Sequence, residues 1–306
     1  MLSEALVKQV ARECGFELAG VAAAGPVADF GRYREWVDAG NAAEMRYLTD
    51  HRVGIRGDVR ELLPTARSVI CVGKLYNTPE PEWNTANARI SRYAWGSGDY
   101  HDVLRAGLER VVEKLRAYGE FDYKICVDTA PLLERSLARE AGLGWIGKNT
   151  CLINEPLGSW FFLGEIVTSL ELAPDGPPPG RCGTCTACIE ACPTHAIVPR
   201  GDGWTIDSRQ CISYWTIEFR GEIPEDKRAG IGDNVFGCDI CQDVCPWNRK
   251  APVTEEETFQ ARPIRLEELL GITAEGFRER FRGTPVARTK HAGMLRNAAV
   301  VKSNVG

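Results

Sequence analysis

The sequence lacks any apolar run of the roughly 18 residues that a membrane span needs. Its first residues, Met1 to Glu4, contain neither the basic stretch nor the twin arginine of an export signal. Positive charge is outnumbered, since 37 Lys and Arg face 42 Asp and Glu, for a net charge of -5 and a pI near 5.6. We therefore expect a cytoplasmic protein without membrane association and without a general basic coat for nucleic acid, although a local basic face remains compatible.

Cysteine, by contrast, is abundant, with 12 residues in the chain. The run from residue 182 to residue 193 has the spacing C-x2-C-x2-C-x3-C-P, in which three thiolates bind one iron-sulfur cluster and the fourth binds another. The run from 238 to 246 keeps the last three positions and lacks the first, and Cys211 is the candidate to replace it. We predict two [4Fe-4S] clusters, one on Cys182, Cys185, Cys188 and Cys245, the other on Cys192, Cys211, Cys238 and Cys241.

Two other uses of these cysteines were weighed. Structural zinc also takes C-x2-C pairs, but it does not require three cysteines followed by C-P. A disulfide framework fits a secreted protein, whereas the remaining cysteines (Cys14, Cys71, Cys126 and Cys151) are scattered through apolar stretches, as reduced buried thiols are. Two clusters in a reducing compartment indicate electron transfer.

The length of 306 residues and the alternating patterns predict an α/β layered domain followed by smaller units. The apolar spacing favours helices over residues 3–15, 31–49 with a break at Gly40-Asn41, and 101–118. It favours strands over 18–23, 67–73, 123–127 and 159–172. A proline-rich linker, 173–180, follows. We place the α/β domain at 1–175, a bacterial ferredoxin-like cluster domain at 176–260 and a helical basic tail at 261–306.

The segment from residue 277 to the end carries seven Lys or Arg against one acid, Glu279. Such a run is either a solvated helical face or a surface for phosphate contacts, and both interpretations remain open. For the second, Arg288, Lys290 and Arg296 are the candidate contacts.

Residues 142–147 match the G-x-G-x-x-G pattern of dinucleotide sites, but they follow a predicted helix rather than a strand, so we expect a turn instead. Asp128 has two candidate roles. It can cap a helix that runs to about Ala141, or it can donate a proton at a strand end, where open α/β sheets bind ligands. His101 fits a structural role, and Ser136 and Lys148 have no visible catalytic partner.

Several stretches, in order along nearly the whole chain, resemble the epoxyqueuosine reductase family. They are residues 92–96 with 99–102, 127–129 through 140–144 to 148–149, 209–213, and 237–242 to 245–246. The cysteine runs are shared with other ferredoxin-like proteins, whereas the segment around Asp128 is more particular to the family.

The resemblance implies a cobalamin-dependent enzyme that reduces epoxyqueuosine at the tRNA anticodon wobble position to queuosine. An external low-potential donor would supply the electrons through the two clusters, and Asp128 would protonate the departing epoxide oxygen. The family's cobalamin contacts correspond here to Arg56, Asp128, Gly147, Leu152, Leu163, Ser213 and Asp239.

The family also leaves cobalt without a protein histidine below it, and none of the four histidines here lies in a D-x-H-x-x-G motif. Residues 294–301 resemble the start of the HEAT-like repeats with which members often continue, and Arg288, Lys290 and Arg296 are then expected to contact tRNA. A monomer is the simplest expectation. Two alternatives remain: a corrinoid reductase of the reductive dehalogenase kind, and a plain iron-sulfur electron carrier.

Overall fold

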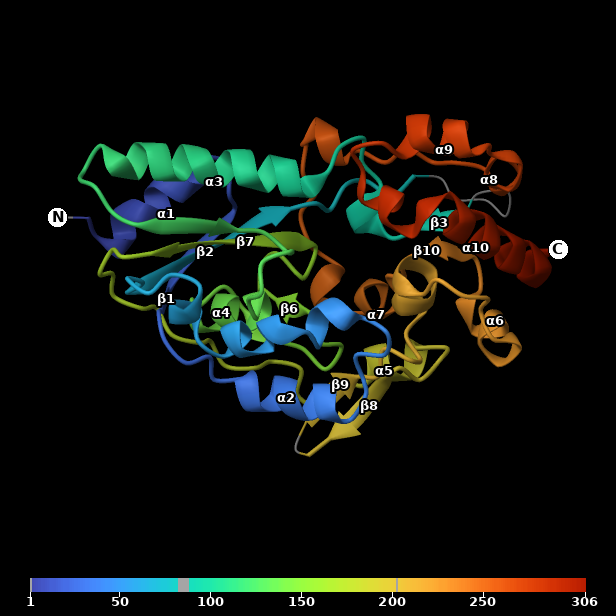
Figure 1. Ribbon diagram of the computed structural model, residues 1–306, viewed down its shortest axis with the longest axis horizontal. Coiled ribbons are helices and arrows are strands. Elements are labelled where there is room, and N and C mark those ends of the chain that lie inside the picture. Colours follow the sequence, from blue (N-terminus) through green and yellow to red (C-terminus); the bar gives the residue numbers. More distant parts are fainter. Residues whose placement is uncertain (1, 82–87, 202) are drawn as a thin grey trace.

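The computed structural model describes residues 2–81, 88–201 and 203–306 (Figure 1). The strands are β1 Leu18–Ala23, β2 Ser68–Leu75, β3 Arg89–Ile90, β4 Tyr123–Cys126, β5 Trp145–Ile146, β6 Leu152–Ile153, β7 Phe161–Thr168, β8 Ile197–Arg200, β9 Gly203–Ile206 and β10 Asn234–Phe236. The helices are α1 Glu4–Glu13, α2 Phe30–Asp38, α3 Tyr100–Arg116, α4 Glu134–Glu140, α5 Ala187–Ala191, α6 Glu225–Ile231, α7 Ile240–Asp243, α8 Leu266–Gly271, α9 Ala274–Phe281 and α10 Lys290–Val305.

A four-stranded sheet in the order β1-β2-β7-β4 organises the first half of the chain. Every neighbouring pair in it is antiparallel, with Ile70 on β2 opposite Ile166 on β7, and Ile166 opposite Ile125 on β4. The mixed α/β class predicted from sequence is confirmed, but the rule that placed ligands at the carboxyl ends of parallel strands does not apply to this sheet.

The two faces of the sheet are covered differently (Figure 1). Helices α1 and α3 cover one face, where Val10, Leu108 and Ile166 share a core. The other face packs against α4, and Val69, Leu137 and Val167 are buried there. The alternation follows from the strand period of two, which sends successive apolar side chains to opposite faces.

The second half of the chain has its own core, to which residues from the first half contribute. Strand β3 pairs in parallel with β10, and Ile90 and Trp95 are buried with Phe236, Leu269 and the inner face of α10. Helices α8, α9 and α10 therefore pack in one core with the helical turn over Tyr214–Glu218 and with strands β3 and β10. Our boundaries at 175 and 260 stay predictions, and neither separates these cores cleanly.

Local differences from the sequence-based expectations concentrate before α4. The helix expected to begin at residues 128–131 begins at Glu134, with Leu133 as its N-cap. Strand β4 was expected to be buried, but it is an edge strand on which Lys124 is exposed. The helix expected over 31–49 ends at Asp38, just before the expected break at Gly40-Asn41, and beyond that break only a short turn of 3-10 helix forms, over Arg46–Leu48. Among the described residues, no helix is long and apolar enough to cross a membrane.

Candidate active site and cluster-binding loops

Asp128 follows edge strand β4 and lies beside the beginning of α3. Its φ of +48° is a left-handed conformation that a non-glycine residue adopts at a cost of about 1 kcal/mol or more. The strained backbone is held by Glu134, whose Oε1 accepts a hydrogen bond from the Asp128 amide over 2.6 Å. Asp128 is therefore not the cap of α4, and its side chain, 50% exposed, is left to interact elsewhere.

The carboxylate of Asp128 meets His101, which forms a bridge between two acids. Nε2 of His101 lies 3.2 Å from Asp128 Oδ2, and Nδ1 lies 2.6 Å from Asp99 Oδ1. Burial opposes the charge on His101, but the hydrogen bonds and charges of Asp128 and Asp99 outweigh it and raise the pKa of His101 to about 9. A structural role alone, as expected for His101, does not describe this residue, because its imidazolium also contacts Asp128, the candidate proton donor.

The same contacts act on Asp128 in the opposite sense. Burial alone would raise the pKa of Asp128, but the hydrogen bond and charge of His101, the charge of Arg288 and a hydrogen bond from Tyr100 together lower it. At neutral pH the resting site therefore holds an aspartate and an imidazolium, and the mobile proton is on His101.

Two further acids lie behind Asp128, and the sequence analysis missed both. Burial and the charge of Asp128 raise the pKa of Glu134 to about 8. Glu165 on β7 is fully buried, and neither of its carboxylate oxygens has a hydrogen-bond partner among the described residues. Burial and the charges of Glu134 and Asp128 raise its pKa well above the ordinary value, so Glu165 is a neutral acid. Its one sequence signal is a lone acid within an apolar strand.

The tail reaches this site through Arg288. Its guanidinium pairs with Glu218, at 2.6 and 3.0 Å, and its charge acts on Asp128. Arg296 instead donates to the backbone oxygens of Trp215, Phe219 and Gly221, which anchors α10. Lys290 is exposed. The three candidate tRNA contacts therefore have different environments, and Arg296 is engaged inside the protein rather than on a phosphate-binding face.

The two groups of cysteines that the spacing predicts stay a prediction, because among the described residues no three His, Cys, Asp or Glu side chains are arranged to hold a metal ion. The charges of Cys182, Cys245 and Cys185 all act on the pKa of Cys188, which burial raises first, to about 11. In the other predicted group, burial and the charges of Cys211 and Cys192 raise the pKa of Cys238 to about 12. The pKa of Cys241 is raised first by Cys151, which belongs to neither predicted group, then by burial and by the charges of Cys238 and Cys211. A thiol affects another thiol in this way only at short range. Thiols from the two runs therefore lie near one another, as the predicted ligand sets require.

The loop after the G-x-G-x-x-G segment connects both cysteine runs. Nζ of Lys148 donates to the carbonyls of Gly183 and Cys185, both over 2.8 Å, and Asn149 Nδ2 donates to the carbonyl of Cys241 over 3.2 Å. The glycines serve the turn as expected: Gly142 has a φ of +78°, and a Cβ on Gly144 would come within 2.2 Å of the Ile153 carbonyl oxygen.

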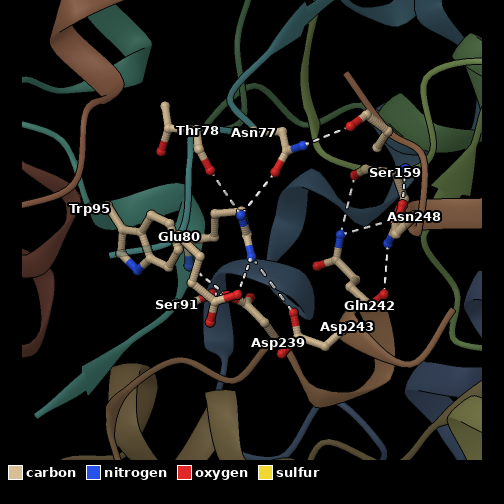
Figure 2. Close-up of polar contacts among 12 residues, drawn as sticks. Asn77, Thr78, Glu80, Ser91, Trp95, Ser159, Asp239, Gln242, Asp243 and Asn248 are labelled. Atoms are coloured by element: carbon tan, nitrogen blue, oxygen red, sulfur yellow. Dashed lines mark hydrogen bonds and ion pairs between the residues drawn. The ribbon is translucent and has the colours of Figure 1, made fainter. Parts of the chain in front are cut away.

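Arg92 clamps the second cysteine run to the first half of the chain (Figure 2). Its Nη1 donates to Asn77 Oδ1 over 2.9 Å and to the Thr78 carbonyl over 3.1 Å, and its guanidinium lies between the rings of Trp95 and Trp160. The Arg92 amide donates to Oδ2 of Asp239 over 2.5 Å, and Ser91 binds the other oxygen. The carboxylate of Asp239, expected to contact the cofactor, is thus occupied in holding the loop that carries Cys238 and Cys241.

The other residues expected to contact the cofactor come from several elements. Leu152 on β6 and Leu163 on β7 belong to the core on the α4 side of the sheet. Ser213 acts on the pKa of Cys211, which burial raises and Ser213 partly lowers. Arg56 is only 5% exposed, yet its Nη1 has no partner among the described residues, while Nη2 donates to the Tyr47 carbonyl over 3.0 Å. A buried, unpaired guanidinium nitrogen fits a ligand that supplies acceptor oxygens.

Comparison with known proteins places these features in a family. An epoxyqueuosine reductase of Xanthomonas campestris is 42% identical, over 98% of this chain and 86% of that relative. The chain belongs to the epoxyqueuosine reductase family. Residues 56–129 match the model "Epoxyqueuosine reductase QueG, DUF1730", and residues 181–248 match a 4Fe-4S double cluster binding domain.

Other epoxyqueuosine reductases give the same result. The protein of Leadbetterella byssophila is 40% identical, with 97% of each chain covered. Two solved structures share the fold. An epoxyqueuosine reductase with a tRNA-Tyr epoxyqueuosine-modified stem loop has a TM-score of 0.91 at 28% identity, over 98% of this chain and 81% of that chain. The Streptococcus thermophilus enzyme has a TM-score of 0.88 at 30% identity, over 99% and 82%.

Proposed function

We propose that this protein reduces epoxyqueuosine in tRNA to queuosine, using cobalamin near Asp128 and electrons relayed by two [4Fe-4S] clusters. The observation that carries the proposal is the His101–Asp128 pair in a chain of this family that also has a double cluster binding domain. A related epoxyqueuosine reductase has been crystallised with an epoxyqueuosine-modified tRNA stem loop, which supports tRNA as the substrate.

The cluster ligands in this proposal are the two predicted groups. Cys182, Cys185, Cys188 and Cys245 would hold one cluster, and Cys192, Cys211, Cys238 and Cys241 the other. Lys148 and Asn149 support both by fixing the backbone of each run. Electrons from an external low-potential donor would pass singly through these clusters.

The unpaired Nη1 of Arg56 and the apolar side chains of Leu152 and Leu163 fit cobalamin, a large ligand rich in amide oxygens. When bound, cobalamin would supply a low-potential metal centre whose redox chemistry no side chain offers. Ser213, Gly147, Asp239 and Asp128 remain further proposed contacts. Asp239 would contact cobalamin through its backbone, because both oxygens of its carboxylate already accept hydrogen bonds from Ser91 and Arg92.

Loss of the epoxide oxygen as water consumes two electrons and two protons, so the site must deliver protons. His101 carries a proton at neutral pH, 3.2 Å from the Asp128 carboxylate. We assign Asp128 as the group that presents the proton to the departing oxygen and His101 as the group that reloads it. Asp99 keeps the imidazole oriented. The Bacillus subtilis enzyme has been observed with its catalytic aspartate loop swung out of the active site, which agrees with a loop whose backbone is strained when in place.

The test uses anaerobically purified protein containing its clusters, with corrinoid added, a chemical reductant and tRNA that carries epoxyqueuosine. Absorbance reports the bound corrinoid and clusters, and mass spectrometry of the digested tRNA reports a nucleoside that has lost one oxygen atom. We expect conversion only with corrinoid and reductant together. Clusters without corrinoid binding would favour an electron carrier. Bound corrinoid with no conversion of the tRNA, but with dehalogenation of aryl halides, would favour the dehalogenase alternative.

A further inference from the structure

Tyr47 is exposed where an aromatic ring is usually covered. In the part of the chain that the structure describes, Tyr47 and Tyr118 are the exposed aromatic side chains, at 38% and 59%. The segment that carries Tyr47 is fixed, because Arg56 donates to its carbonyl over 3.0 Å and the Tyr33 hydroxyl donates to the carbonyl of Leu48. An exposed aromatic ring on a fixed segment can stack on another flat group without a large loss of conformational entropy.

Arg288 lies over this ring, with its guanidinium carbon 5.3 Å from the ring centroid. Glu218, only 18% exposed at its side chain, receives Nε at 2.6 Å and Nη2 at 3.0 Å in a fork that fixes the guanidinium plane. The same fork balances the charge of Arg288. A ligand can therefore stack on the flat face of the guanidinium, whereas a phosphate would have to compete with Glu218 for its N–H groups.

This pair lies within electrostatic range of Asp128. The charge of Asp128 acts on both Tyr47 and Arg288, although these residues come from opposite ends of the chain. Burial, followed by the charge of Glu218, raises the pKa of Tyr47 to about 12, so the ring stays neutral. Arg288 of the tail thus contacts Tyr47 of the first half of the chain by stacking.

We propose that Tyr47 and Arg288 form a stacking surface for the nucleobase of the tRNA nucleoside whose modified side chain reaches Asp128. The inference rests on the proposed function and adds the recognition of the base. Enzymes that act on a base take it out of the stack and cover its face with aromatic or guanidinium planes. Because Arg288 is charge-balanced, its contribution is planar contact rather than phosphate neutralisation.

The test measures binding of an anticodon stem loop with 2-aminopurine at the wobble position to cobalamin-loaded protein, across a salt series. Wild type and Tyr47→Phe should quench the fluorescence equally. Tyr47→Leu should abolish the quenching and weaken binding about tenfold. Arg288→Lys should weaken it several-fold, with an unchanged salt slope in both variants. Tyr118→Leu is the matched control, because it removes the other exposed ring, at the far end of α3.

Quenching and affinity in Tyr47→Leu that equal those of wild type would overturn the proposal. Equal loss in Tyr47→Phe would also overturn it, since the hydroxyl and not the ring face would then bind. A reduced salt slope in Arg288→Gln, with Arg288→Lys like wild type, would make Arg288 a phosphate contact and contradict stacking. Turnover of the epoxyqueuosine stem loop by wild type is measured separately, so failure of the proposed function is seen without reference to Tyr47.

Discussion

The molecule contains two charged clusters that differ in how far their charges are satisfied. Around Arg92 the charged groups are paired and the guanidinium lies over two tryptophan rings, although Arg92 Nε and the Thr78 hydroxyl have no hydrogen-bond partner among the described residues. Around Asp128 the backbone is strained, the side chain is half exposed, and His101 carries a proton that can move. The comparison indicates that the first cluster stabilises the fold, whereas the second is built for chemistry.

The most direct way to break this comparison is Asp128→Asn. If the cluster around Asp128 serves chemistry, the variant should lose activity by about 100- to 10,000-fold while its clusters, corrinoid content and melting temperature remain those of wild type. The assay is nucleoside mass spectrometry of the treated tRNA. Asp102→Asn, an exposed acid in the first turn of α3, is the control. Turnover in Asp128→Asn equal to the control would remove Asp128 from the mechanism.

Arg92→Leu tests the other half. Removing the guanidinium takes the ion pair from Asp243 and the opposing charge from Asp239, whose bond to the backbone amide of residue 92 is kept, and we expect the free energy of unfolding to fall by about 3 kcal/mol. Thermal unfolding and the signal of the second cluster should change together. Lys114→Leu loses only a surface pair with Glu13, whose side chains are 47% and 45% exposed, so it should leave the free energy of unfolding close to that of wild type. Similar losses in both variants would contradict the structural role of the Arg92 clamp.

His101→Gln should have a smaller effect on rate, about 10- to 100-fold, because Asp128 can be reloaded more slowly from water. The pH profile is more informative. Wild-type activity should decline as pH rises through about 9, where His101 loses its proton, and the variant should lack this decline. His51→Gln, at an exposed histidine, should keep it. A wild-type profile that is flat through this range would argue against the proton reservoir.

Glu165→Gln should change the free energy of unfolding little at acidic pH, and should raise it relative to wild type increasingly as the pH rises. The pKa of Glu165 is raised on folding, so the native state binds a proton that the unfolded state releases, and stability falls as pH rises above about 4.5. The glutamine removes this decline, by at most about 1.4 kcal/mol per pH unit. Unfolding measured from pH 5 to 8 checks it, with exposed Glu171→Gln as control. Parallel curves for wild type and Glu165→Gln would mean that Glu165 is ionised.

The sequence was sufficient where the signal is local. The cysteine spacing predicted the double cluster binding domain that residues 181–248 match, and the strand patterns predicted β1, β2 and β7 within a few residues. It was misleading at Asp128, where cap-like residues precede a helix that begins six residues later, because Glu134 captures the Asp128 amide instead. The antiparallel sheet and the fates of Arg288 and Arg296 depend on contacts between distant segments, which periodicity does not encode.

The pairing of β3 with β10 sets a limit on how this protein can be divided. A fragment that began at the proline-rich linker would contain all eight candidate cluster cysteines, but it would lack Ile90, Trp95 and the backbone that binds Asp239. Its core would be open along one side, and the loop with Cys238 and Cys241 would lose its anchor. The cluster-bearing half is therefore not a detachable ferredoxin. A fragment made for expression or engineering must include the segment around residue 90.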